Sequence, residues 1–141
     1  MKKKLAALLA LALSLSMLSG CRGARKLPEG MEEESVSQAA QAIVTQLLAG
    51  EYDAVAAAFR DDLEQELNIT GQTVADLMAT VEEAGAYVGT DEILVLGGKS
   101  KNFDEPYAAV AVYCAHENED VIYELSLDSN LELIGLRAKE R

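Results

Sequence analysis

The hydrophobic residues of this chain change their spacing partway along the sequence, and this change constrains the fold more than any other feature. From Val36 to Gly85 they recur every three or four positions, which is typical of helices with one buried face. From Asp91 onward they alternate with polar or small residues, as in strands with one buried face. Helices followed by strands indicate an α+β domain, and 141 residues suffice for one such domain.

The first half predicts three helices separated by glycines and polar turns. Ser35 or Ser37 is a suitable N-cap for the first helix, and Gly50 is a suitable stop. A second helix is expected from Asp53, and a third from a capping box that starts at Thr73. The expected buried positions are Val36, Ala40, Ile43, Val44, Leu47 and Leu48, then Tyr52, Val55, Phe59, Leu63 and Leu67, then Val74, Leu77, Met78 and Val81.

The second half predicts four strands in an antiparallel meander, over residues 91–99, 107–116, 121–128 and 131–137. Val110, Val112 and Cys114 share one face of the second strand, and Tyr113 lies on the other face with small alanines. Cys114 is therefore expected to be a buried, unreactive, small apolar side chain. In the third strand, alternation predicts that Val121, Tyr123, Leu125 and Leu127 point inward.

Residues 1–20 have the pattern of a secretory signal peptide. Three lysines precede a 13-residue apolar stretch at 5–17, which is shorter than the about 20 residues needed to span a bilayer. Residues 18–21, LSGC, resemble the lipobox of bacterial lipoproteins, in which the cysteine thiol accepts a diacylglyceryl group. We therefore expect Cys21 to be lipidated and to hold the protein on the cell membrane, facing outside the cytoplasm. An ordinary secreted protein with a chance cysteine at its cleavage site is the alternative.

The rest of the chain divides into a tether and a domain. Residues 21–36 lack an apolar period and are expected to be a flexible tether, and residues 37–141 are expected to be one α+β domain. The chain has a net charge of −12, which becomes −15 once the three leader lysines are removed. This charge excludes a nucleic-acid-binding protein. Two cysteines and one histidine exclude a disulfide scaffold and a histidine-rich metal site.

No catalytic, metal or cofactor motif is complete in this sequence, so none of these sites is predicted. Gly97 to Ser100 reads GGKS, but a phosphate loop needs a glycine where Ile93 stands. Asp128 begins a segment like a calcium loop, but Leu133 replaces its required glycine. The single histidine, His116, precedes a polar turn and is expected to be solvated.

Part of the pattern resembles a bacterial family catalogued as domain of unknown function 3887. The resemblance covers roughly residues 37–141 and is carried by the segment Leu47 to Tyr52, by Val55 and Phe59, and by the segment Asp128 to Leu136. It implies a cone-like fold of the cystatin or nuclear-transport-factor-2-like type, with three N-terminal helices packed on a curved four-stranded antiparallel sheet. Because that domain also occurs beside α/β-hydrolase domains, an accessory role for a separate hydrolase is one alternative.

The favoured function is a non-catalytic binding or interaction module whose partner is a protein or a small apolar ligand. Conical folds of this kind leave a pocket at the wide end of the sheet, and Tyr87, Tyr107 and Tyr113 are its candidate lining residues. The main alternative is a small enzyme whose acid/base group in that pocket is His116, or a buried carboxylate such as Asp91 or Glu124.

Overall fold

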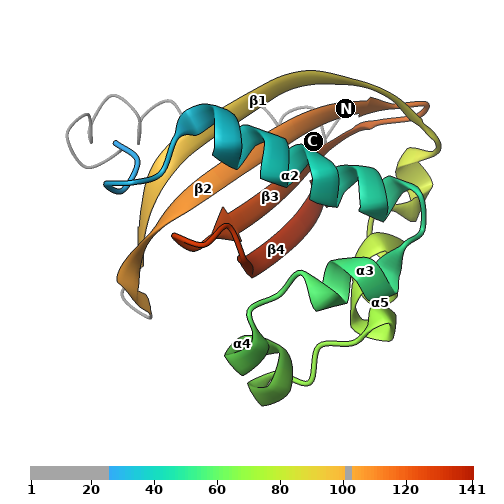
Figure 1. The fold of residues 1–141 in the computed structure, drawn as a ribbon. Helices are drawn as coiled ribbons and strands as arrows, with labels where there is room; N and C mark the ends of the chain where they lie inside the picture. Colours follow the sequence, from blue (N-terminus) through green and yellow to red (C-terminus); the bar gives the residue numbers. More distant parts are fainter. Residues whose placement is uncertain (1–25, 101–102) are drawn as a thin grey trace.

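The computed structural model describes residues 26–100 and 103–141 and shows helices on one face of an antiparallel sheet (Figure 1). The helices are α2 (Glu33–Leu48), α3 (Tyr52–Ala57), α4 (Asp61–Glu66) and α5 (Gly71–Ala79), followed by the 3₁₀ turn η1 (Glu82–Ala84). The strands are β1 (Tyr87–Ser100), β2 (Phe103–His116), β3 (Asp120–Leu127) and β4 (Leu133–Glu140). Each strand pairs antiparallel with the next in the order β1-β2-β3-β4, so the predicted meander is confirmed.

The core lies between α2 and the sheet, which curves behind this helix (Figure 1). Helix α2 contributes a stripe at helical spacing, and β2 and β3 contribute alternate residues, because successive strand side chains point to opposite faces. The predicted inward residues of both strands are buried, including Val110, Val112, Cys114, Val121, Tyr123, Leu125 and Leu127. Gly50 follows α2 with φ at +77°, a conformation that glycine adopts without strain, so the predicted stop is also confirmed.

The predicted second helix is two short helices instead of one. The chain leaves the helical path at Phe59, which forms a parallel bridge with Leu133 at the start of β4. Two backbone hydrogen bonds fix this break, from the Arg60 amide to the Leu133 carbonyl and from the Leu133 amide to the Ala58 carbonyl, each 2.9 Å long. Phe59 is buried as predicted, but Leu67 beyond the break is 63% exposed, because α4 no longer continues the stripe of α3.

The third helix begins earlier than predicted. Thr70 is its N-cap, and Thr70 and Thr73 exchange side-chain to backbone hydrogen bonds of 3.0 and 3.4 Å in a capping box. Thr73 thus occupies the third helical position rather than the cap. The helix ends at Ala79, and Gly85, with φ at +85°, ends η1 rather than the helix.

The expected flexible tether is partly ordered. From Lys26 the chain is described, and Leu27 and Met31 pack against the core. Helix α2 starts at Glu33 without a side-chain cap from Ser35 or Ser37, and Val36 is fully buried. The domain therefore begins before residue 37, because these apolar side chains find a surface that the local sequence does not reveal. The predicted signal peptide and Cys21 lie outside the described residues.

Candidate functional site

A groove of about 530 Å³ opens between two groups of elements. Helices α3 and α5, the turn η1 and the C-terminal end of α2 form one side, and the start of β1 and the end of β2 form the other. Its volume lies within the range of roughly 300–1,000 Å³ that small-ligand sites occupy. The groove is lined by Leu47, Leu48, Tyr52, Ala75, Met78, Ala79, Val81, Glu82, Gly85, Ala86, Tyr87, His116 and Tyr123. Most of these residues are aliphatic or aromatic. Tyr52, Tyr87 and His116 have rings with exposed surface in the groove, whereas Tyr123 is fully buried.

His116 has both ring nitrogens in hydrogen bonds. As the last residue of β2 it lies on the core-facing side of the strand, two positions after Cys114. Its Nδ1 lies 2.8 Å from the carbonyl oxygen of Gly85, and its Nε2 lies 3.1 Å from the hydroxyl of Tyr123. Because a carbonyl only accepts, Nδ1 carries the hydrogen in the neutral ring, and Nε2 accepts from the tyrosine hydroxyl.

The expectation that His116 is solvated is wrong in one respect: the side chain is half-buried, and both of its ring nitrogens have protein partners. The alternation of β2 was the signal that could have placed it inward, since it continues the series of Val110, Val112 and Cys114. The polar turn that follows suggested exposure, whereas the histidine itself packs against η1 and β3.

Two tyrosines flank this histidine in different ways. Tyr123 is 0% exposed, and burial raises the pKa of its phenol well above the ordinary value, so the hydroxyl stays protonated and able to donate. Tyr87 is 43% exposed, and its ring meets the His116 ring edge-on with centroids 5.9 Å apart. The Tyr87 hydroxyl lies 2.8 Å from the Thr90 hydroxyl, which holds the ring at the groove mouth.

The structure brings together a different set of tyrosines from the predicted one. Tyr87 lines the groove, but Tyr107 and Tyr113 lie on the opposite face of the sheet, because they alternate with the core residues of β2. The Tyr107 ring lies so close over Gly98 that a Cβ there would clash, and the Tyr113 ring lies 5.2 Å from the Arg141 guanidinium. Tyr52 and Tyr123 line the groove instead. The helical spacing of apolar residues predicted that Tyr52 is buried, and the alternation in the third strand predicted the same for Tyr123.

The other candidate acid/base residues do not enter the groove. Glu124 faces the far side of the sheet, where its Oε1 lies 2.6 Å from Nη2 of Arg137 and 3.6 Å from Nζ of Lys139. Asp91 is exposed on β1 and does not line the groove. Cys114 is buried as predicted, and burial raises the pKa of its thiol, which disfavours the reactive thiolate.

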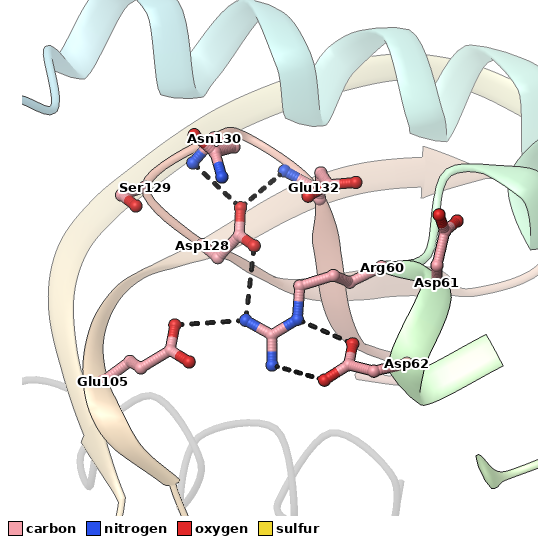
Figure 2. Close-up of a pocket in the computed structure, with 8 residues that line it drawn as sticks. All are labelled: Arg60, Asp61, Asp62, Glu105, Asp128, Ser129, Asn130 and Glu132. Atoms are coloured by element: carbon pink, nitrogen blue, oxygen red, sulfur yellow. Dashed lines mark hydrogen bonds and ion pairs between the residues drawn. The ribbon is translucent and has the colours of Figure 1, made fainter. Parts of the chain in front are cut away.

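A second hollow, shown in Figure 2, is polar and centres on Arg60 at the break between α3 and α4. The guanidinium contacts three carboxylates: Nε lies 2.8 Å from Asp62, and Nη1 lies 3.1 Å from Glu105 and 3.4 Å from Asp128. The hydrogen bond from Arg60 holds the pKa of Asp62 below its ordinary value. These contacts join the helices to β2 and to the turn before β4.

Asp128 shows why this hollow is structural. It is buried, and its Oδ1 accepts the backbone amides of Asn130 and Glu132, each at 2.9 Å, while Oδ2 faces Arg60 (Figure 2). The carboxylate therefore closes the β3–β4 turn. Within the described residues, no group of three or more histidine, cysteine, aspartate or glutamate side chains is placed to hold a metal ion.

Comparison with solved structures shows similarity to the NMR structure of a protein from Ruminococcus gnavus ATCC 29149. The two are 22% identical with a TM-score of 0.64, over 79% of this chain and 94% of that chain, so the likeness concerns the fold alone. A search of curated proteins finds no match. The family model that matches covers residues 40–136, which includes α3, α5 and the strands that build the groove. The chain belongs to the family described as protein of unknown function (DUF3887).

Proposed function

We propose that this protein is a membrane-anchored extracytoplasmic lipoprotein, attached through lipid on Cys21, whose domain binds a partner through the groove beside His116. The sequence of residues 1–21 supports the anchor, since a basic start, a short apolar stretch and the LSGC box follow in the right order. No helix in the described part of the chain is long and apolar enough to cross a membrane. We also propose that the domain has a cone-like fold of the cystatin or nuclear-transport-factor-2-like type.

The observation that carries the binding role is the state of the titratable groups in the groove. General acid/base catalysis needs a group that is free to exchange a proton with a substrate at the working pH. Here His116 is held by Gly85 and Tyr123 through both nitrogens, and the buried phenol of Tyr123 has a raised pKa. A groove built mainly from aliphatic and aromatic residues, in which both ring nitrogens of the histidine already have protein partners, suits recognition by contact better than proton transfer.

The anchor is tested by expressing the full chain in a bacterium and separating membranes from the soluble fraction. We expect the protein in the membrane fraction, with an N-terminal peptide that starts at Cys21 and carries the mass of a diacylglyceryl group. Cys21→Ala is expected to keep its fold, because the described core is built from residues beyond position 26, but to lose the lipid. A water-soluble wild-type product that starts at another residue would refute the anchor.

The binding role is tested against the enzyme alternative by incubating the chain with ester, peptide and glycoside substrates. We expect no turnover by the wild type or by His116→Ala. Turnover that disappears in His116→Ala would replace the binding module with an enzyme, and the groove would then be its active site.

A further inference from the structure

Charge is unevenly distributed over this domain, and the groove lies on its acidic side. From Leu27 to Ala86, the segment that forms all the helices, the sequence holds 13 acidic residues and a single basic one, Arg60. Arg60 already contacts three carboxylates, those of Asp62, Glu105 and Asp128. The helical layer therefore presents a strongly negative surface.

The basic residues of β4, and Arg141 after it, lie on the other side of the sheet. Arg137 and Lys139 pair with Glu124 there, and Arg141 lies over the Tyr113 ring. These cations are separated from the groove by the sheet itself, because the groove opens on the helical face. The excess of acidic residues on the helices therefore leaves the groove in a negative field.

One acidic side chain lines the groove, and a second precedes a lining residue in the sequence. Glu82 lines the groove from η1, and Glu51 is the residue before Tyr52. Both are exposed, and neither pairs with a cation within the described part of the chain. Tyr87 at the mouth adds an exposed ring, whose face attracts cations, and the neighbouring Val88 is 66% exposed.

We propose that the groove binds a cationic segment of a partner protein, in which one or two apolar side chains are flanked by lysines or arginines. The inference rests on the proposed binding role and adds the chemistry of the partner. Apolar side chains of the segment contact Met78 and the rings of Tyr52 and Tyr87, and its basic side chains lie near Glu82. Methionine adapts its shape to different apolar groups, which suits a groove that receives a side chain from outside.

The test uses a peptide whose own fluorescence reports binding, because this protein has no tryptophan. The probe is acetyl-KKWLKK-amide, and its charge controls are acetyl-SSWLSS-amide and acetyl-EEWLEE-amide. Each is titrated with the purified full chain in a neutral-detergent buffer, and the same buffer without protein is the blank. We expect saturable binding of the lysine peptide, with tryptophan emission shifted to shorter wavelength, and weakening of this binding as salt is raised. The serine peptide is expected to bind at least about three-fold more weakly, and the glutamate peptide more weakly still.

Matched variants separate the groove from the general charge of the protein. Tyr87→Ser is expected to weaken binding about ten-fold, as for the loss of an aromatic contact, whereas Tyr87→Phe keeps the ring and the binding. Glu82→Gln is expected to weaken binding about three-fold, whereas Glu66→Gln on α4 removes the same charge with less than about a two-fold effect. Leu67→Ser removes an exposed apolar side chain outside the groove and serves as the control for Tyr87→Ser. Circular dichroism checks that each variant is folded.

Three results would overturn the inference. Absence of saturable binding of the lysine peptide would refute the cationic partner. Equal or tighter binding of the serine or glutamate peptide would refute the charge preference and leave the groove as a binding site of another specificity. Equal losses in Glu82→Gln and Glu66→Gln, with no loss in Tyr87→Ser, would mean that the peptide binds the acidic surface in general. None of these results bears on the lipid anchor or on the turnover assay, which test the proposed function separately.

Discussion

Replacing Tyr123 with phenylalanine isolates the hydrogen bond that fixes His116. The ring is fully buried and phenylalanine keeps it, so the change removes one hydroxyl, whose partner is the Nε2 atom of His116 at 3.1 Å. A hydrogen bond of this kind contributes about 0.5–1.5 kcal/mol net to stability. The histidine stands at an open groove, where water is able to replace the lost donor, so we expect Tyr123→Phe to lower the free energy of unfolding by about 1 kcal/mol.

The measurement is equilibrium unfolding in urea, followed by far-UV circular dichroism, for the wild type, Tyr123→Phe, His116→Ala and the double variant. This double-mutant cycle gives the interaction free energy of the pair, which is expected to be about 0.5–1.5 kcal/mol. Tyr123→Ala is the contrasting variant, because it loses the ring as well and is expected to cost about 3–5 kcal/mol.

Nitrogen NMR of the His116 imidazole tests the hydrogen-bond geometry from which this interaction free energy is expected. The Gly85 carbonyl accepts from Nδ1 in both the wild type and Tyr123→Phe, so the tautomer with hydrogen on Nδ1 is expected in both for the neutral ring. A wild-type ring with its hydrogen on Nε2, or an interaction free energy within about 0.3 kcal/mol of zero, would refute the reasoning.

Three further outcomes are expected. Phe59→Ala should cost about 3–5 kcal/mol in the same urea assay, because the ring is buried in the core, and a cost below about 1 kcal/mol would contradict this. Cys114 should react slowly with a thiol reagent in native buffer and quickly in denaturant, and Cys114→Ser should cost about 1–2 kcal/mol; fast native labelling would disprove its burial. Arg60→Met should lower stability more at pH 6 than at pH 3. The pKa of Asp62 is lower in the folded protein than its unfolded value of about 3.9, so the ion pair stabilises the fold above that value, and this contribution is lost as the pH falls through the folded pKa. An equal loss of stability at both pH values would contradict the role of the ion pair.

The order of helices and strands and the inward faces of β2 and β3 follow from the sequence. Hydrophobic spacing is a local property, and a residue such as Val112 is buried on whichever sheet its strand joins. The alternation of β2 also places His116 on the inward face, although a polar turn follows it. Positions of helix ends were predicted less well: Thr70 and Thr73 both suit a cap, and local spacing alone does not choose between them.

Tertiary structure decided the features that join distant parts of the chain. The helix breaks at Phe59 because Leu133, far along the sequence, supplies hydrogen bonds that compete with the next helical turn. The tyrosines of the groove meet because the pairing of β2 with β3 brings Tyr123 to His116, while η1 supplies the Gly85 carbonyl. Such contacts depend on strand register and on helix packing against the sheet, which arise only when the whole chain is folded, so no local pattern encodes them.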